Sequence, residues 1–338
     1  MAHSDHLSED AALTISAALR RMGLLGPGEE ARFTALTGGV SSDIHLVETP
    51  SRRFCIKRAL ARLKVAAVWE APTNRNAAEA AWIRQVGQWL PDGVPTLLGQ
   101  DEQLGLFAMA FLPPDLNPVW KVDLLAQRVD ATFAGRVGAD LGLIHAASAR
   151  QAGLAARFAN DATFQPIRIE PYLIATARAH PDLAGKIEAV ATRTLANKKA
   201  LIHGDVSPKN ILCGQKGPVF LDAECACFGD PAFDLAFCLN HLLLKGARRG
   251  VPRAAYRGAF EALVSAYFDR IDWEDRADLE ARTAALLPVL FLARVDGKSP
   301  VEYLAHADER EAVRRFGRPL IADPQQDLIA IANAWIRQ

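Results

Sequence analysis

Apolar residues along the chain follow two different spacings, and the change between them falls near residue 112. Before that point, short apolar or alternating segments bounded by Gly, Pro and polar clusters predict β-strands. These segments cover residues 32–36, 44–48, 54–57, 93–98 and 105–112. Helical spacings from Ser8 to about Gly23 and again at 76–83 predict helices beside them. The first part of the chain is therefore expected to be a small antiparallel sheet with helices.

Strand signals nearly vanish after Leu112, where a pair of prolines ends the last segment. Longer helical spacings follow. They cover residues 126–147, 172–199 and several segments after residue 234. We therefore expect an α+β chain of two domains, residues 1–112 and 113–338, of which the second is larger and mainly helical.

The second domain contains two short apolar runs joined by the polar turn 214–217, which is bounded by glycines. This pattern is typical of a β-hairpin. The hairpin would place Asn210 and Asp222 within about one residue of facing each other, with Asp205 one short loop before them. Clustered carboxylate and amide oxygens suit Mg²⁺, and one carboxylate remains to handle a proton.

The balance of charge argues against partners that need a strongly basic or acidic chain. Lys and Arg number 39, as do Asp and Glu, so no overall field recruits nucleic acid or an anionic membrane. No apolar run approaches the ~20 residues of a membrane span, and the N-terminal MAHSDHLSED does not resemble a signal peptide. Five scattered cysteines fit a reducing compartment. We expect a cytoplasmic protein.

The loop between the first two predicted strands is rich in glycine and serine. Such a loop lays backbone N–H groups over a phosphate, but hairpin tips are Gly-rich in any case. The candidate phosphate ligands are Gly38, Gly39, Ser41 and Ser42. Lys57 lies on the next strand; a lone Lys on a strand is ordinarily solvated, but this one follows the Gly-rich hairpin. Glu79, on an alanine-rich helix, is either a surface charge or is carried inward.

The order of these parts resembles the aminoglycoside phosphotransferase and choline kinase superfamily, which also includes methylthioribose and fructosamine kinases. The resemblance covers roughly residues 35–243 and rests on the Gly-rich hairpin, the strand Lys, the helical Glu, HGDVSPKN at 203–210 and GDPAFDLA at 229–236. HGD, in place of the HRD of protein kinases, distinguishes this group. The resemblance implies a bilobal, protein-kinase-like fold, with a nucleotide-binding first lobe and the catalytic loop and substrate site in the second.

The resemblance also implies roles in the second lobe. Asp205 would accept or orient the proton of a substrate hydroxyl as it attacks the γ-phosphate of ATP. Asn210 and Asp222 would hold Mg²⁺ against the phosphates. Glu224 is a third metal candidate, with contact to substrate and simple solvation as its alternatives. His203 and Asp234 would support the loop by hydrogen bonds.

In the first lobe, the resemblance implies a nucleotide site. Lys57 would bind the α- and β-phosphates of ATP and be fixed by Glu79, with Glu70 as the alternative partner. The loop 38–42 would cover the phosphates. Adenine would pack against an apolar linker that includes Met109 and Phe111.

The function implied is ATP- and Mg²⁺-dependent transfer of a phosphoryl group to a hydroxyl of a small molecule. Alternatives are an aminoglycoside antibiotic kinase, a methylthioribose kinase-like enzyme, and a nucleotide-binding regulator without turnover. A protein kinase is disfavoured because DAE at 222–224 replaces DFG and no APE activation segment follows.

Three other patterns in the sequence carry weaker signals. Cys225, Cys227, Cys238 and His241 do not have the spacing of a zinc knuckle. DGKS at 296–299 lacks the first glycine of a Walker A loop. The polar break at 294–300 is either a substrate-side loop or an ordinary helix connection.

Overall fold

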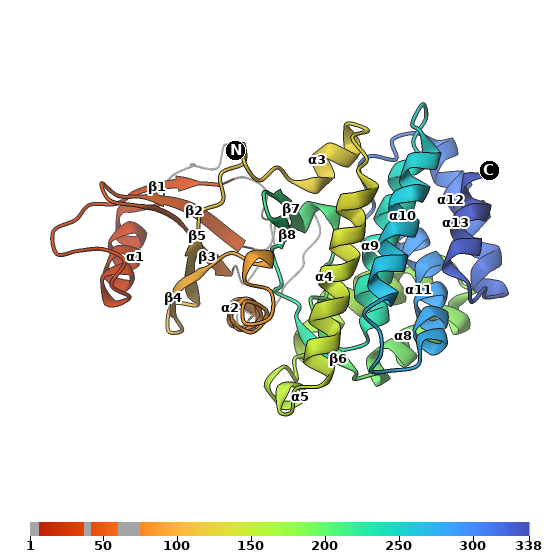
Figure 1. Ribbon diagram of the computed structural model, residues 1–338, viewed down its shortest axis with the longest axis horizontal. Helices are drawn as coiled ribbons and strands as arrows, with labels where there is room; N and C mark the ends of the chain where they lie inside the picture. The colour runs from red at the N-terminus through yellow and green to blue at the C-terminus, as the bar shows by residue number, and fades with distance from the viewer. Residues whose placement is uncertain (1–6, 37–41, 60–74, 338) are drawn as a thin grey trace. The chain divides into compact units, whose positions relative to one another are not determined.

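The computed structural model describes residues 7–36, 42–59 and 75–337 (Figure 1). The chain divides into two compact units, Met1–Pro113 and Pro114–Gln338. Within the described residues, the first unit holds a five-stranded antiparallel sheet and the second is mainly helical. The expected α+β class, with the sheet first and the helices after it, is confirmed.

The sheet of the first unit has the strand order β1-β2-β3-β5-β4. Its strands are β1 (Arg32–Ala35), β2 (Ser42–Glu48), β3 (Arg53–Ala59), β4 (Leu97–Asp101) and β5 (Leu106–Ala110). The strand predicted at 93–98 was placed too early. Residues Pro91–Gly93 form the short helix η1 instead. Pro95, which has no N–H to donate to a ladder, precedes the strand.

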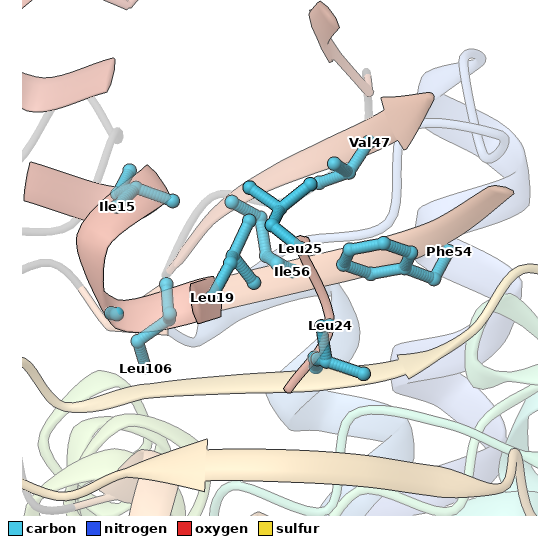
Figure 2. Close-up of a cluster of buried hydrophobic side chains, with 10 residues drawn as sticks. Ile15, Leu19, Leu24, Leu25, Val47, Phe54, Ile56 and Leu106 are labelled. Carbon is cyan, nitrogen blue, oxygen red and sulfur yellow. The ribbon is translucent and has the colours of Figure 1, made fainter. Parts of the chain in front are cut away.

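Helix α1 (Glu9–Arg21) covers one face of this sheet. It begins as predicted, because the side chain of Ser8 caps its N-terminus. The buried cluster in Figure 2 joins Leu19 of the helix to Phe54 and Ile56 of β3. Phe54 and Ile56 are alternate residues of β3 and share one face of the strand. Because both are buried under α1, that face of β3 is turned toward the helix.

Lys57 lies on the opposite face of β3, because successive side chains of a strand alternate. Helix α2 (Arg75–Val86) approaches that face. Asn76 near its start donates hydrogen bonds from Nδ2 to the carbonyl oxygens of Lys57 (3.0 Å) and Gly105 (2.8 Å). The first turn of α2 is therefore attached to β3 and to the β4–β5 turn.

The second unit consists of helices and two short antiparallel sheets in its described residues. The helical segments are α3 (Trp120–Leu125), α4 (Ala131–Ala149), α5 (Leu154–Arg157), α6 (Asp161–Phe164), η2 (Gln165–Ile174), α7 (Ala175–Ala179), α8 (Ala184–Ala196), η3 (Pro208–Asn210), α9 (Pro231–Gly246), α10 (Arg253–Phe268), α11 (Arg276–Asp296), α12 (Ala307–Ala322) and α13 (Leu328–Ile336). The strands are β6 (Ala200–Ile202), β7 (Ile211–Gly214), β8 (Gly217–Phe220) and β9 (Cys227–Gly229). No helix of the described residues combines the length and apolarity that crossing a membrane requires.

Two predicted helices have different ends. The segment predicted at 126–147 begins at Ala131, because Gln127 has a left-handed backbone (φ 63°) that breaks the helix. The segment predicted at 172–199 is interrupted between α7 and α8. Pro181 lies in this interruption, and it lacks an N–H and restricts the residue before it.

Helices α4 and α10 run side by side at close range (Figure 1). A Cβ added at Gly138 of α4 would lie 2.2 Å from the carbonyl oxygen of Leu263, and one at Gly142 would lie 2.9 Å from that of Tyr267. Glycine is therefore required for this approach. The same approach sets the hydroxyl of Tyr267 2.9 Å from Nδ1 of His145.

We expect Gly138→Ala to lower the free energy of unfolding by about 1–2 kcal/mol, because overpacking against a backbone oxygen outweighs the gain in helix propensity. Urea denaturation would measure it. Gly258→Ala in α10 is the matched control, since a Cβ there meets nothing within 4 Å; it should raise stability by up to about 1 kcal/mol. Equal effects of the two substitutions would contradict the packing argument.

Candidate active site

The loop that follows β6 carries the HGD residues. It leads through η3 into the hairpin of β7 and β8, and Gly214 pairs with Gly217 at the turn, which confirms the predicted hairpin. Leu221 N–H donates to the carbonyl oxygen of Asn210 (2.8 Å). Asn210 and Asp222 are therefore brought to the open end of the hairpin, as expected.

Gly204 allows this loop to turn against its neighbour. Its φ is +79°, and a Cβ would lie 2.8 Å from the carbonyl oxygen of Cys225. A side chain would meet both backbone strain and a clash with backbone. The HGD motif thus needs glycine at its centre for conformational reasons.

Asp234 of α9 fixes the backbone of the loop. Its Oδ2 accepts a hydrogen bond from the N–H of His203 (2.7 Å), and its Oδ1 accepts one from Gly204 (2.8 Å). Nε2 of His145 lies 3.3 Å from Oδ2. All three side chains are buried, so the expected tie between the loop and the following helix is present.

The imidazole of His203 connects the loop to the hairpin. Nδ1 accepts a hydrogen bond from the N–H of Asp205 (3.1 Å), and Nε2 donates to the carbonyl oxygen of Leu221 (3.0 Å). Burial lowers the pKa of His203, and the neutral ring provides the one donor and one acceptor that these bonds need. The expected supporting hydrogen bonds of His203 are therefore formed.

Asp205 is buried, and its two carboxylate oxygens differ. Oδ2 accepts from Nη2 of Arg168 (2.8 Å) and lies 3.1 Å from Nζ of Lys209. Oδ1 is buried and has no hydrogen-bond partner among the described residues. Burial alone would raise the pKa of Asp205, but Arg168 and Lys209 outweigh it and hold that pKa below its ordinary value. One oxygen of a permanent carboxylate is thus left to accept a hydrogen bond.

Arg168 positions this carboxylate, and sequence reasoning missed it. The residue lies on η2 and also donates from Nε to the carbonyl oxygen of Gly204 (2.6 Å). It is 5% exposed. An arginine inside the apolar run at 167–173 was the available signal, because such a position is buried when the run is helical. Lys209, inside the HGD segment, was also not assigned a role.

The side chains proposed to bind Mg²⁺ are those of Asn210, Asp222 and Glu224, and all three follow Asp205 along the chain. Nδ2 of Asn210 donates to the carbonyl oxygen of Asp205 (3.1 Å), so Oδ1 points away from that bond. Asp222 has a left-handed backbone (φ 67°), a conformation that Asp tolerates better than most residues and that is frequent at functional sites. Glu224 is 4% exposed.

These side chains fit a magnesium ion that also binds phosphates. In the described part of the chain, no group of three or more His, Cys, Asp or Glu side chains is placed so that it could hold a metal ion by itself. Mg²⁺ in nucleotide sites commonly takes one or two protein oxygens and completes its shell with phosphates and waters. Asn210 and Asp222 can supply that number, with Glu224 as a third candidate.

In the first unit, Lys57 and Glu79 form a buried ion pair. Nζ of Lys57 lies 2.6 Å from Oε2 of Glu79, and both side chains are 2% exposed. Burial of two charges costs desolvation energy that apolar residues would not incur, so this pair is more readily explained by function than by stability. The alternative partner, Glu70, lies outside the described residues.

The structure describes only some of the remaining residues that were predicted to bind the nucleotide. Gly38, Gly39 and Ser41 lie outside the described residues. Ser42 begins β2, and its buried Oγ has no partner among the described residues. Met109 lies on β5 and Phe111 follows that strand, where Arg53 approaches its ring at 4.9 Å from the centroid.

A family model described as the phosphotransferase enzyme family matches residues 32–279, which include both the Lys57–Glu79 pair and the Asp205 loop. The chain belongs to this phosphotransferase family. The resemblance inferred from the HGD and GDPAFD motifs is therefore confirmed.

Curated relatives of this chain include two methylthioribose kinases. The one from Erwinia tasmaniensis is 25% identical over 218 residues, and the one from Yersinia enterocolitica is 23% identical over 219. Each match covers 57% of this chain and 54% of the relative. The chain thus spans about half the length of the curated relatives it matches.

Solved structures show that the chain has a kinase-like fold. An amicoumacin kinase in complex with AMP-PNP, Ca²⁺ and Ami superposes with a TM-score of 0.59 at 14% identity, covering 96% of this chain and 98% of that one. A choline/ethanolamine kinase family protein from Mesorhizobium loti superposes with a TM-score of 0.53 at 16% identity, covering 97% and 98%.

Proposed function

We propose that this chain transfers the γ-phosphate of ATP to a hydroxyl group of a small molecule. The observation that carries the proposal is the state of Asp205. Its carboxylate is buried and held by Arg168, while Oδ1 has no partner among the described residues. An ionised oxygen kept free in this way suits a hydroxyl group that must lose its proton.

In the proposed reaction, Asp205 Oδ1 accepts a hydrogen bond from the acceptor hydroxyl and directs its oxygen at the γ-phosphate. The low pKa of Asp205 makes it a weak base. It therefore orients the hydroxyl first and takes the proton as the γ-phosphoryl group leaves ADP and bonds to the hydroxyl oxygen, which a loose transition state permits. Arg168 and Lys209 keep the carboxylate charged and stationary throughout.

The nucleotide would be held by residues of the first unit. Lys57, oriented by Glu79, would bind the α- and β-phosphates, and the loop 38–42 would cover them. Met109 and Phe111 would contact adenine. Asn210 and Asp222 would hold Mg²⁺, which supplies neutralisation of the phosphate charge when bound.

The proposal is tested with purified protein, ATP and MgCl₂. ADP formation would be followed with methylthioribose, which the curated relatives suggest, and with choline, sugars, amino sugars, hydroxy acids and sugar phosphates. We expect at least one acceptor to raise ADP formation above that of Asp205→Asn. A panel in which no acceptor separates the two proteins would contradict the proposal.

The pH dependence of the rate tests the role of Lys209. Loss of its charge in Lys209→Met should raise the pKa of Asp205, and since the ionised form is active, kcat/KM should begin to fall at a higher pH on acidification. Lys209 is 48% exposed, so solvent screening limits the shift to about one pH unit or less. If kcat/KM of Lys209→Met fell at the same acidic pH as that of the wild type, Lys209 would not influence the pKa of Asp205.

A further inference from the structure

Basic side chains from α9 and α11 gather in the second unit. Lys245 of α9 lies with Nζ 4.4 Å from the ring centroid of Tyr303. His241, one turn earlier, has Nδ1 3.0 Å from the hydroxyl of Tyr303. Burial lowers the pKa of both residues, and charge repulsion from Arg294, near the end of α11, and from Lys121 of α3 lowers it further. We call Lys121, His241, Lys245 and Arg294 the basic cluster.

The cluster lacks matching negative charge. Lys245 is 1% exposed, and its Nζ has no carboxylate or hydrogen-bond acceptor among the described residues. Arg294 is 9% exposed and donates to Ser299, while its buried Nε has no partner in the described part of the chain. Glu302 raises the pKa of Lys245, but this carboxylate already pairs with Lys121 at 2.5 Å.

Tyr172 connects the cluster to the reacting carboxylate. Nη1 of Arg294 lies 3.3 Å from its hydroxyl, and the guanidinium lies 5.5 Å from its ring centroid. Arg168 lies 6.0 Å from the same ring and holds Asp205. Lys209, which also contacts Asp205, contributes to the lowered pKa of His241 by charge repulsion. The cluster and Asp205 are therefore neighbours within one unit.

A buried cation without a counter-ion is costly. Burial lowers the pKa of Lys245 well below its ordinary value, with Lys121 and Arg294 acting in the same direction. A ligand anion would relieve this cost, whereas a cationic acceptor would increase it. The same argument disfavours the aminoglycoside alternative, because aminoglycosides are polycations.

We propose that Lys245 and Arg294 bind an anionic group, a carboxylate or a phosphate ester, on the acceptor whose hydroxyl meets Asp205. This inference rests on the proposed kinase function for the identity of the ligand. The binding of an anion at the cluster can be measured without turnover.

Calorimetric titration of the full chain tests the inference with matched pairs of probes. Glycerate is compared with glycerol, and glucose 6-phosphate with glucose. We expect at least one anion to bind about tenfold or more tightly than its neutral twin, and the pair that responds tells a carboxylate from a phosphate site. Lys245→Met and Arg294→Met should each weaken the binding of that anion about 10- to 100-fold, as expected for loss of a charge-assisted hydrogen bond.

Two controls separate binding from general damage. Lys199→Met removes an exposed lysine before β6 and should bind the anion as the wild type does. Lys245→Met should melt no lower than the wild type without ligand, because burying an amine that has no carboxylate partner costs stability and methionine removes that cost. A purely structural lysine would give the opposite result, and a lower melting temperature would count against the site.

At pH 8, anion binding to the wild type should take up protons, seen as a dependence of the heat on the buffer, and this uptake should vanish in Lys245→Met.

Equal binding of anions and neutral twins, or equal anion binding by wild type and both cluster variants, would overturn the inference. ADP formation is scored in parallel with ATP present. Absence of turnover with every acceptor would contradict the kinase function, while the binding comparison would still decide the anion site.

Discussion

Replacing Asp205 by Asn should lower kcat/KM for phosphoryl transfer by about 10²- to 10⁴-fold, the range typical of a lost general base. Asn keeps the size of the side chain and its amide oxygen still accepts from Arg168. It carries no negative charge and cannot take the hydroxyl proton. The variant should bind ATP with nearly unchanged affinity, because the proposed nucleotide contacts lie on Lys57 and its neighbours.

The matched control is Asp269→Asn, which removes an exposed carboxylate at the end of α10. It should leave both kcat and KM unchanged. Initial rates and calorimetric ATP binding would be measured for both variants. An Asp205→Asn protein that keeps ATP binding and retains a rate near that of Asp269→Asn would remove Asp205 from the mechanism.

Asp222→Asn should lower kcat/KM by about 100-fold, since Asp222 is one of the two residues proposed to hold Mg²⁺ and a metal ion supplies several kcal/mol of charge stabilisation in the transition state. The substitution is chosen for its backbone. Asp222 has φ 67°, and Asn tolerates this left-handed conformation while alanine would add strain. The change therefore isolates the charge of the ligand from the fold of the loop.

Mn²⁺ binding in the presence of ATP, followed by electron paramagnetic resonance, gives a readout apart from the rate. Asp222→Asn should weaken Mn²⁺ binding, while Glu224→Gln should leave it unchanged if Asn210 and Asp222 suffice. Weakened binding in Glu224→Gln alone would reverse this assignment. The pair of variants thus decides which carboxylate meets the metal.

The geometry of the loop from His203 to Asp222 was predictable because its parts are local in sequence. A two-residue turn between short apolar strands determines which residues face each other, so Asn210 and Asp222 had to meet at the open end. The tie from Asp234 to the loop followed from the family resemblance. The same holds for the Lys57–Glu79 pair, which composition and spacing left open.

The cationic surroundings of Asp205 were not predictable, for two physical reasons. Arg168 and Arg294 reach this region from helices distant in sequence, and helical spacing alone does not say which helices meet. Lys245 lies in a helix that is buried on every side, whereas a lysine in a sequence is ordinarily taken to be solvated. Helix ends were also misjudged where a left-handed residue, Gln127, or a proline, Pro181, interrupts a favourable apolar pattern.

The central claim is that Asp205 directs the phosphorylation of a small hydroxylated molecule. The most direct measurement incubates a metabolite extract with ATP, Mg²⁺ and either the wild type or Asp205→Asn, and compares the products by mass spectrometry. We predict that at least one hydroxylated metabolite gains a phosphoryl group with the wild type and not with the variant. Identical product profiles from the two proteins, both of them folded and able to bind ATP, would contradict the account.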